Sequence, residues 1–499
     1  MKIYIINHTF RYETENIVRV FFPNEKLEIF CYDSKENISF EVPYLLTEIS
    51  DSINGKNIGV SICFENYSKT VTETVSDCGD ESACTDEQER IIAVCIFKLL
   101  TEYTKIIPLW GILTGVRPIK LFRRMVKTIG LNDTKAYFRD KLLVSEEKIA
   151  LCEETEKNEN SIIQLSSDNS YSLYVSIPFC PTRCSYCSFV SQSTEKTARL
   201  IEPYVELLCK ELIYTAEILS AYPLKLETVY IGGGTPTTLN AEQLERLLAV
   251  IRQHFPMQNC REFTVEAGRP DTITEDKLKA ILNGGADRIS INPQTMNDDI
   301  LKAIGRKHTA KQTLDAFALA RKVGFSHINM DLIVGLPDET FESFQHTLSS
   351  ITALSPESIT VHTLAMKRSS HLTAQGMDIV RENSETACKM HAYCRELLHR
   401  KGYHPYYLYR QSRMVGNLEN VGYAKSGFDG LYNVYIMDET HSIIACGGGA
   451  VTKLKSPCDS TLKRVFNYKY PYEYIGQFDE ILRRKEELKL FLDREYNCS

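Results

Sequence analysis

Three cysteines lie within eight positions in the stretch YVSIPFCPTRCSYCSF, residues 174–189. They are Cys180, Cys184 and Cys187, and an aromatic residue rather than a fourth cysteine follows them. Thiolates are soft ligands that suit zinc, copper(I) or an iron–sulfur cluster. A structural zinc site takes four protein ligands, usually as two separated pairs, and no histidine lies near these cysteines in the sequence. The spacing therefore favours a cluster with three cysteine ligands, which leaves one iron open for a substrate or cofactor.

The composition is that of an ordinary globular protein. The chain has 499 residues, of which 43% are hydrophobic and 25% charged, and its formal charge is −7. A net negative charge gives no electrostatic footprint for nucleic acid, and no apolar run reaches the length of a membrane span. Most of the 16 cysteines are scattered singly, which is typical of reduced thiols. We therefore expect a cytoplasmic protein with no nucleic-acid partner and no membrane span.

Short β-like runs alternate with longer helical patterns in the second part of the chain, as parallel βαβ units require. The six candidate strands are residues 172–177, 227–233, 262–268, 288–294, 327–335 and 358–364. This rhythm predicts an α/β barrel or a doubly wound sheet, in which chemistry is placed at the carboxyl ends of the strands. The residues at or just past predicted strand ends are Cys180, the glycines of residues 232–234, Glu266, Gln294 and Asp331.

The chain is expected to divide near residue 165. The polar stretch EETEKNENSIIQLSSDNS, residues 153–170, has the composition of a boundary. Before it, β-like runs and two helical patterns predict an N-terminal α+β domain over residues 1–165. We expect the barrel core over residues 166–380, and a C-terminal region, residues 381–499, that completes the barrel and a substrate pocket.

A glycine run, YIGGGTPTTL, ends the second candidate strand at residues 230–239. It is not the GxGxxG pattern of a dinucleotide site. Glycine allows a backbone to approach a ligand closely. We therefore expect the amides of Gly233, Gly234 and Thr235 to face polar groups of a cofactor.

The cysteine stretch CPTRCSYC resembles the cluster motif of radical S-adenosylmethionine (radical SAM) enzymes, including an aromatic residue, Tyr186, before the third cysteine. The resemblance implies a 4Fe-4S cluster held by the three cysteines, with S-adenosylmethionine on the open iron. It also implies a fold, the partial (β/α)6 barrel of that superfamily, and a reaction in which a 5′-deoxyadenosyl radical removes hydrogen from a substrate. The cofactor would carry the difficult chemistry, and the protein would orient it.

Over about residues 170–480 the chain resembles the oxygen-independent coproporphyrinogen III oxidase family, through Y-x-x-I-P-F-C, GRKH and D-L-I-x-G-L-P. Residues 1–165, 109–125 and 402–424 are similar to its HemZ, or coproporphyrinogen dehydrogenase, branch. The resemblance implies oxidative decarboxylation of coproporphyrinogen III to protoporphyrinogen IX, supported by an electron donor such as flavodoxin or ferredoxin. The cofactor-binding residues that it implies are Tyr174, Gly233, Gly234, Thr235, Glu266, Gln294, Arg306, Asp331 and Ala365.

Several positions depart from the well-defined oxidases of this family. Phe189 stands where they have a further cysteine, and Ser176 where they have a histidine. After the stretch NYKYPYEYIGQ, residues 467–477, only one helical stretch, residues 478–492, is expected, in place of their C-terminal helical domain. A sister group acts as haem chaperones, but Gly416 stands where its haem-binding histidine would be. The alternatives are therefore a haem-binding or haem-transfer protein, or a related haem-modifying radical SAM methyltransferase.

An aromatic and basic stretch near the end of the barrel region has two interpretations. Its aromatic faces and guanidinium groups could bind the ring and carboxylates of a porphyrinogen or a haem-like molecule. It could equally be an aromatic core strand that ends in solvated arginines. The residues concerned are Tyr403, Tyr406, Tyr407, Tyr409, Arg410 and Arg413.

Overall fold

The computed structural model describes residues 1–36, 38–53, 55–76, 79–187, 191–365, 384–459 and 461–496. The chain divides into two compact units. The first unit comprises Met1–Glu153 and Arg410–Leu418, and the second comprises Glu154–Tyr409 and Glu419–Ser499. Phe189 lies outside the described residues.

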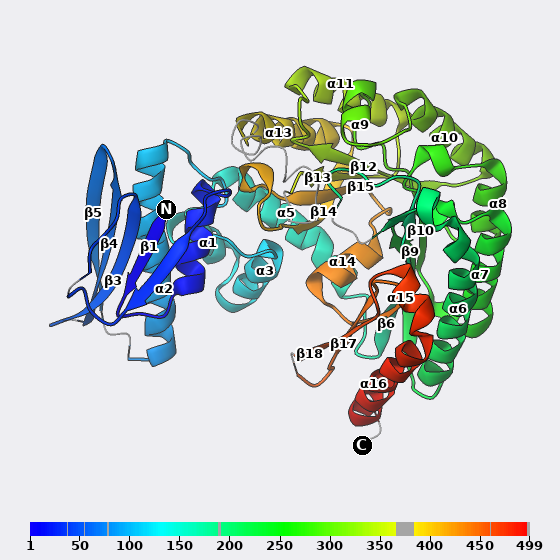
Figure 1. Ribbon diagram of the computed structural model, residues 1–499, viewed down its shortest axis with the longest axis horizontal. Helices are drawn as coiled ribbons and strands as arrows, with labels where there is room; N and C mark the ends of the chain where they lie inside the picture. The colour runs from blue at the N-terminus through cyan, green and yellow to red at the C-terminus, as the bar shows by residue number, and fades with distance from the viewer. Residues whose placement is uncertain are drawn as a thin grey trace. The chain divides into compact units, whose positions relative to one another are not determined.

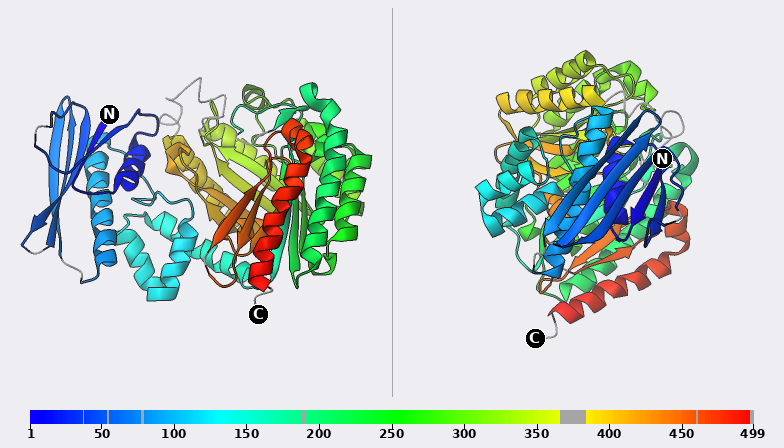
Figure 2. Two further views of the ribbon diagram at one scale, coloured as in Figure 1. Left: turned by 60° about the horizontal axis from the view of Figure 1, so that its bottom comes forward. Right: turned by 90° about the vertical axis from the view of Figure 1, so that its left-hand side faces the viewer.

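The first unit is built on a five-stranded sheet in the order β2-β1-β3-β4-β5. Its strands are β1 (Lys2–Ile6), β2 (Glu28–Tyr32), β3 (Tyr44–Ser52), β4 (Gly55–Phe64) and β5 (Tyr67–Ser76). Alternate residues of β4, namely Ile58, Val60 and Ile62, are fully buried, as the two-residue period of a strand requires. Helices α1 (Arg11–Phe21) and α2 (Glu81–Thr104) lie on one face of this sheet (Figure 2).

Three further helices follow in this part of the chain, α3 (Pro118–Ile129), α4 (Leu131–Asp140) and α5 (Glu146–Ile163). The segment Arg410–Leu418 belongs to the first unit although it lies far along the chain. Its Arg410 guanidinium lies 5.2 Å from the centre of the Trp110 ring and donates to the carbonyl oxygen of Leu113. This buried arginine therefore helps to hold the segment in the first unit.

The second unit contains an eleven-stranded sheet in the order β14-β15-β13-β12-β11-β10-β9-β6-β16-β17-β18. Its centre consists of six parallel strands in chain order, which confirms the predicted α/β architecture. These strands are β6 (Ser170–Ile177), β9 (Lys225–Gly233), β10 (Glu262–Glu266), β11 (Arg288–Ser290), β12 (His327–Val334) and β13 (Ser358–Thr363). Their carboxyl ends consequently meet at one edge of the sheet, where the predicted site residues were expected.

Helices cover the outer face of these strands (Figure 1). They are α6 (Thr194–Ser220), α7 (Ala241–His254), α8 (Glu275–Asn283), α9 (Asp298–Ala303), α10 (Ala310–Val323) and α11 (Phe341–Leu354). These helices pack on the sheet through an apolar stripe. In helix α7 the stripe consists of Leu244, Leu247, Leu248 and Ile251, which are buried and recur at helical spacing. Asn240 caps the start of this helix by accepting from the Gln243 amide.

The remaining elements complete both edges of the large sheet. They are α13 (Ser384–Arg400), β14 (Tyr403–Tyr409), β15 (Asn420–Lys425), α14 (Leu431–Asp438), β16 (Ser442–Cys446), β17 (Val451–Lys455), β18 (Leu462–Phe466), α15 (Pro471–Gly476) and α16 (Phe478–Tyr496). Strand β16 pairs parallel with β6, and β15 pairs antiparallel with β13. After residue 477 the described chain has the one helix that was expected, α16, and the short helix α15 lies just before it.

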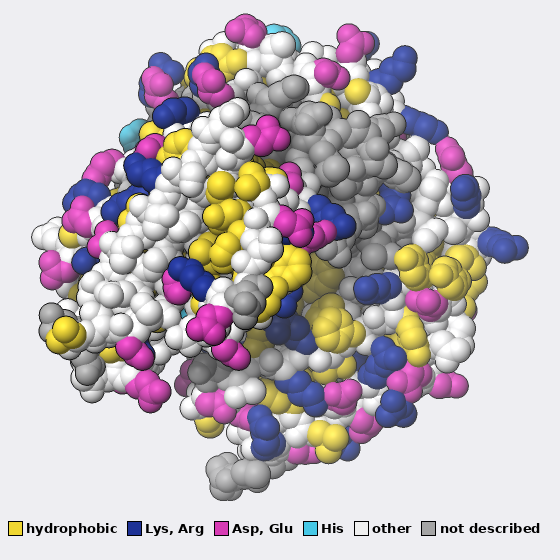
Figure 3. All heavy atoms as spheres, turned by 60° about the vertical axis from the view of Figure 1, so that its left-hand side comes forward, with side chains coloured by type: hydrophobic (Ala, Val, Ile, Leu, Met, Phe, Trp, Pro, Cys, Tyr) yellow, Lys and Arg dark blue, Asp and Glu magenta, His cyan; other side chains and the backbone are white. Residues whose placement is uncertain are grey.

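Charged side chains of both signs are interspersed over the face drawn in Figure 3. Among the helices of the described chain, none is both long enough and apolar enough to span a membrane.

Candidate cluster and cofactor site

The three cysteines lie in residues 180–187, just past β6; we call this segment the cysteine loop, and its first residue, Cys180, ends the two-residue strand β7 (Phe179–Cys180). Cys184 is buried, Cys180 and Cys187 are half-buried, and all three are free thiols. The Cys187 amide donates to the Cys184 carbonyl oxygen at 3.2 Å, which turns the loop back on itself. Within the described residues, no group of three or more His, Cys, Asp or Glu side chains is arranged to hold a metal ion.

Two buried arginines hold the cysteine loop. Arg269 follows β10, and its Nη1 lies 3.7 Å from the Cys184 sulfur. Arg306 lies just after α9 and donates from Nε and Nη2 to the Tyr186 hydroxyl, at 3.2 and 3.0 Å. The Nη1 of Arg306 also donates to the carbonyl oxygens of Gly268 and Asn292. The resemblance implies that Arg306 binds the cofactor, whereas Nε, Nη1 and Nη2 of its guanidinium all donate to groups of the protein.

The electrostatic environment of the loop is positive. Burial raises the pKa of the Cys180 thiol, while hydrogen bonds from Ser191 and Thr235 and the charge of Arg269 act in the opposite direction. Burial, together with the charges of Arg306 and Arg269, lowers the pKa of His308 to about 3. His308 is therefore neutral at physiological pH. Asp271, which pairs with Arg269, offsets part of the positive charge of the two guanidinium groups beside the cysteine loop.

The glycine run holds the backbone next to the cysteine loop. The amides of Gly234 and Thr235 donate to the carbonyl oxygens of Ile177 and Phe179, at 2.8 and 2.7 Å. Our expectation that these two amides face a cofactor is therefore wrong, because the end of β6 already occupies them. Gly233, at φ +105°, adopts a backbone conformation that favours glycine. The Thr235 hydroxyl donates to the Cys180 sulfur at 3.5 Å, so the run still contacts the candidate cluster ligands.

Glu266, at the end of β10, lies beside a stack of tyrosine rings. The Tyr230 hydroxyl donates to its carboxylate at 2.6 Å. The ring of Tyr230 stacks on Tyr432, with centroids 4.5 Å apart, and on Tyr174, 6.3 Å away. Burial raises the pKa of Glu266 to about 7 despite the Tyr230 hydrogen bond, and the charge of Asp331 adds to the rise. A cationic ligand next to this carboxyl group would favour its ionised form.

Asp331, on β12, is ionised at neutral pH. Burial alone would raise its pKa, but hydrogen bonds and the charge of His362 hold the pKa below its ordinary value. The Asn329 amide donates to its Oδ1 at 2.7 Å, and His362 Nε2 lies 3.6 Å from Oδ2. The sequence did not single out His362, although its place near the carboxyl end of a predicted strand was a usable signal.

Gln294 has an unusual backbone and an unused side-chain oxygen. Its φ of +70° is uncommon for a residue other than glycine. Its amide donates to the Asp331 carbonyl oxygen, and its own carbonyl accepts from Ile333. Its buried Oε1 has no hydrogen-bond partner within the described chain, so this atom is available to a ligand. Ala365, just after β13, is half-buried close to the same strand ends.

The types of the residues present suit a three-cysteine cluster and its cofactor, and the three thiols, which do not form a metal-holding group in this structure, would converge on the cluster when it binds. Cys180, Cys184 and Cys187 would hold the cluster, and three thiolates suit an iron–sulfur core. Glu266, Gln294 and Asp331 would orient the bound cofactor with carboxylate and amide oxygens. The charge of Arg269 favours the Cys180 thiolate, the form that binds metal, but burial outweighs it and keeps the pKa of this thiol above its ordinary value. A reduced cluster with S-adenosylmethionine supplies a carbon radical that removes hydrogen from a substrate.

Comparisons with known proteins decide the family. The Radical SAM superfamily model matches residues 174–351. The oxygen-independent coproporphyrinogen-III oxidase-like protein HemZ of Bacillus subtilis is 36% identical over 478 residues, which are 94% of this chain and 94% of HemZ. The chain belongs to this radical SAM family. Members of the superfamily use a 4Fe-4S cluster and S-adenosylmethionine, so these are its cofactors.

Other relatives of this radical SAM protein are a haem chaperone and a coproporphyrinogen III oxidase. The haem chaperone HemW of Bacillus subtilis is 36% identical over 197 residues, 39% of this chain and 51% of HemW. The structure of coproporphyrinogen III oxidase (HemN) from Escherichia coli, a radical SAM enzyme, aligns with a TM-score of 0.51 at 23% identity. The alignment covers 64% of this chain and 72% of the HemN chain, and it shows that the two proteins share a fold.

The aromatic and basic stretch is a core strand for the most part. Tyr406 and Tyr407, on β14, pack in a buried cluster with Ile162 and Tyr435. The Arg410 guanidinium donates to Leu113 and Asn417 oxygens and is buried. The structure thus favours the core interpretation for these residues over direct binding of a tetrapyrrole.

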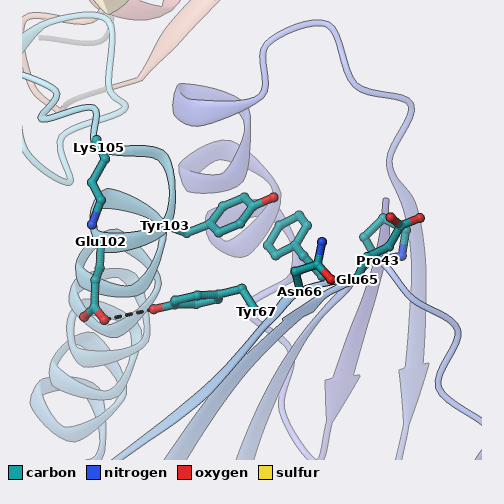
Figure 4. A pocket seen from close by; sticks show the side chains of 8 residues that line it. Pro43, Glu65, Asn66, Tyr67, Glu102, Tyr103 and Lys105 are labelled. Atoms are coloured by element: carbon teal, nitrogen blue, oxygen red, sulfur yellow. Dashed lines mark hydrogen bonds between the residues drawn. The ribbon is translucent and has the colours of Figure 1, made fainter.

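A pocket of about 560 Å³ lies in the first unit, which does not contain the cysteine loop. Its wall includes the stacked rings of Phe64 and Tyr103, 4.0 Å apart. The Tyr67 hydroxyl donates to Glu102 at 3.0 Å (Figure 4). This pocket therefore belongs to the first unit and is separate in the chain from the radical SAM site.

Asp331 provides a direct test of the cofactor assignment. Asp331→Asn keeps the shape of the side chain and removes its charge, so we expect S-adenosylmethionine to bind ten- to a hundredfold more weakly, about 1.5–3 kcal/mol. Anaerobic calorimetry on the iron-loaded protein measures this affinity. Asp315→Asn, on the exposed surface of α10, is the matched control and should bind like the parent. Equal affinities in all three proteins would remove Asp331 from the site.

Proposed function

We propose that this protein catalyses the oxygen-independent oxidative decarboxylation of coproporphyrinogen III to protoporphyrinogen IX. Each of two propionates would lose a hydrogen atom from its β-carbon and then carbon dioxide, and one electron would pass to an acceptor as the vinyl group forms. A one-electron donor such as flavodoxin or ferredoxin would reduce the cluster. The observation that carries the proposal is the match to HemZ, an oxidase-like protein, over 94% of both chains.

The arrangement of the site is compatible with this chemistry. The candidate cluster ligands follow β6, Glu266 ends β10 and Asp331 lies on β12, and these three strands belong to the same parallel part of the sheet. The tyrosine stack of Tyr174, Tyr230 and Tyr432 presents aromatic surface beside them. Such a stack would exclude water from a reacting carbon and orient an apolar ring.

Haem transfer is the second candidate, because the haem chaperone HemW is also a relative. A chaperone would bind haem and would not couple cofactor cleavage to decarboxylation. Gly416 stands where the chaperone group has its haem-binding histidine, and it lies in a short turn at φ +62°. His404 is half-buried and bonded to Asp429 at 2.8 Å, so this histidine already has a partner.

Product analysis without oxygen separates the two candidates. The iron-loaded, reduced protein is incubated with S-adenosylmethionine and coproporphyrinogen III labelled with deuterium at the propionate β-carbons. We expect vinyl-bearing products, and deuterium in the 5′-deoxyadenosine that accumulates. A parallel reaction without the porphyrinogen gives the uncoupled rate. Tight haem binding, with cofactor cleavage that the porphyrinogen does not accelerate, would contradict the decarboxylase and support haem transfer.

A further inference from the structure

Arg269 is a buried cation next to the candidate cluster that sequence reasoning did not find. Its side chain is 3% exposed, and it forms a fork with Asp271, with Nε–Oδ1 and Nη2–Oδ2 distances of 3.1 and 3.2 Å. A planar guanidinium paired in this way is held in one orientation. The fork fixes where the remaining N–H groups of Arg269 point.

Those remaining groups point at the cysteine loop. Nη1 lies 3.7 Å from the Cys184 sulfur and 3.4 Å from the Thr182 carbonyl oxygen. Nη2 also donates to the Thr182 hydroxyl at 3.1 Å, and this hydroxyl in turn donates to the Gly305 carbonyl oxygen at 3.0 Å. Arg269 therefore contacts one predicted cluster ligand, Cys184, directly. It also holds Thr182, which lies between Cys180 and Cys184 in the chain.

We propose that Arg269, oriented by Asp271, is a positioning residue that sets the reduction potential of the cluster held by the cysteine loop. One-electron reduction adds a negative charge to the cluster, and the electron comes from an external low-potential donor. A buried cation and an N–H···S hydrogen bond both stabilise the more negative, reduced state. Arg269 consequently makes the cluster easier to reduce. The inference rests on the cluster of this family and not on the proposed substrate.

The second arginine at the loop has a different role. Arg306 uses Nε, Nη1 and Nη2 on the Tyr186 hydroxyl and on two backbone carbonyl oxygens. Its substitution would disturb the fold of the loop itself. Arg269 has an N–H group 3.7 Å from the Cys184 sulfur and a paired carboxylate, Asp271, that permits the opposite charge change, so it is the arginine whose removal tests the electrostatic effect.

Two variants with opposite charge changes test the proposal. Arg269→Gln removes the cation, so the midpoint potential of the cluster should become more negative. Asp271→Asn removes the neighbouring anion, so the potential should become more positive. The full-length protein is reconstituted anaerobically and titrated with dithionite, while the reduced cluster is followed by electron paramagnetic resonance. Arg252→Gln is the matched control, because Arg252 is exposed and donates to the Asn283 carbonyl oxygen far from the loop in sequence.

Opposite shifts in the two variants, with the control unchanged, would support the proposal, because a merely structural role gives no such change of sign. If Arg269→Gln retains its iron and the parent potential, the proposal is wrong. If that variant loses its iron, Asp271→Asn decides: a positive shift supports the proposal, and an unchanged or negative shift overturns it. The measured quantity is the midpoint potential of the cluster, which does not depend on coproporphyrinogen. The test of Arg269 therefore stands even if the protein proves not to be a decarboxylase.

Discussion

Cys184→Ala should abolish the cluster and with it all cleavage of S-adenosylmethionine. Cys184 is the buried member of the three, 8% exposed, and Arg269 contacts its sulfur. With two thiolates left, a cubane core would lack a ligand that the protein cannot replace, since no fourth cysteine stands in the described loop. The parent should bind about four irons per chain after anaerobic reconstitution. Iron analysis and the visible absorbance of the cluster measure both proteins.

Cys209→Ala is the matched control for this loss. Cys209 is also 8% exposed, but it lies within α6 and burial raises its pKa to about 11, which is typical of an inert structural thiol. This variant should keep its iron. Zinc bound in place of iron, or equal iron contents in Cys184→Ala and the parent, would contradict the cluster assignment.

The six parallel strands were predictable because each is a short apolar run followed by an amphipathic helix. The predicted fourth strand was too long: β11 ends at Ser290 rather than at residue 294. Pro293 has no amide to donate, and Gln294 adopts a positive φ, so the regular ladder stops before them. Gln294 and Leu332 still form an isolated bridge, which keeps Gln294 beside β12.

The site was predictable in part. The types of Glu266 and Asp331 and their places on predicted strands indicated polar groups near the cysteines; the structure places Glu266 at the end of β10, whereas Asp331 lies within β12. The contact of Arg269 with Cys184 joins residues 85 positions apart, and no local pattern encodes such a distance. The hydrogen-bond partners of Arg306 and of the glycine amides could not be predicted either, because they depend on which backbone segments lie opposite these residues after folding.

Gly234→Ala should remove most of the cluster by displacing the backbone that leads into the cysteine loop. A Cβ atom at Gly234 would lie 2.5 Å from the Phe179 carbonyl oxygen and 2.9 Å from that of Ile177. Both are backbone atoms, and both accept hydrogen bonds from the glycine run, so neither can move without opening that contact. Overpacking of this kind costs about 1–3 kcal/mol. We expect a lower melting temperature and an iron content far below that of the parent.

Gly476→Ala, at the end of α15, separates this steric effect from a general sensitivity to glycine substitution. A Cβ atom there meets nothing within 4 Å, so the variant should match the parent in melting temperature and in iron content. Normal iron binding by Gly234→Ala would show that the end of β6 can shift without disturbing the cysteines. A selective loss in Gly234→Ala would instead assign the glycine run its role: it lets the strand end approach β9 closely enough to set the cysteine loop in place.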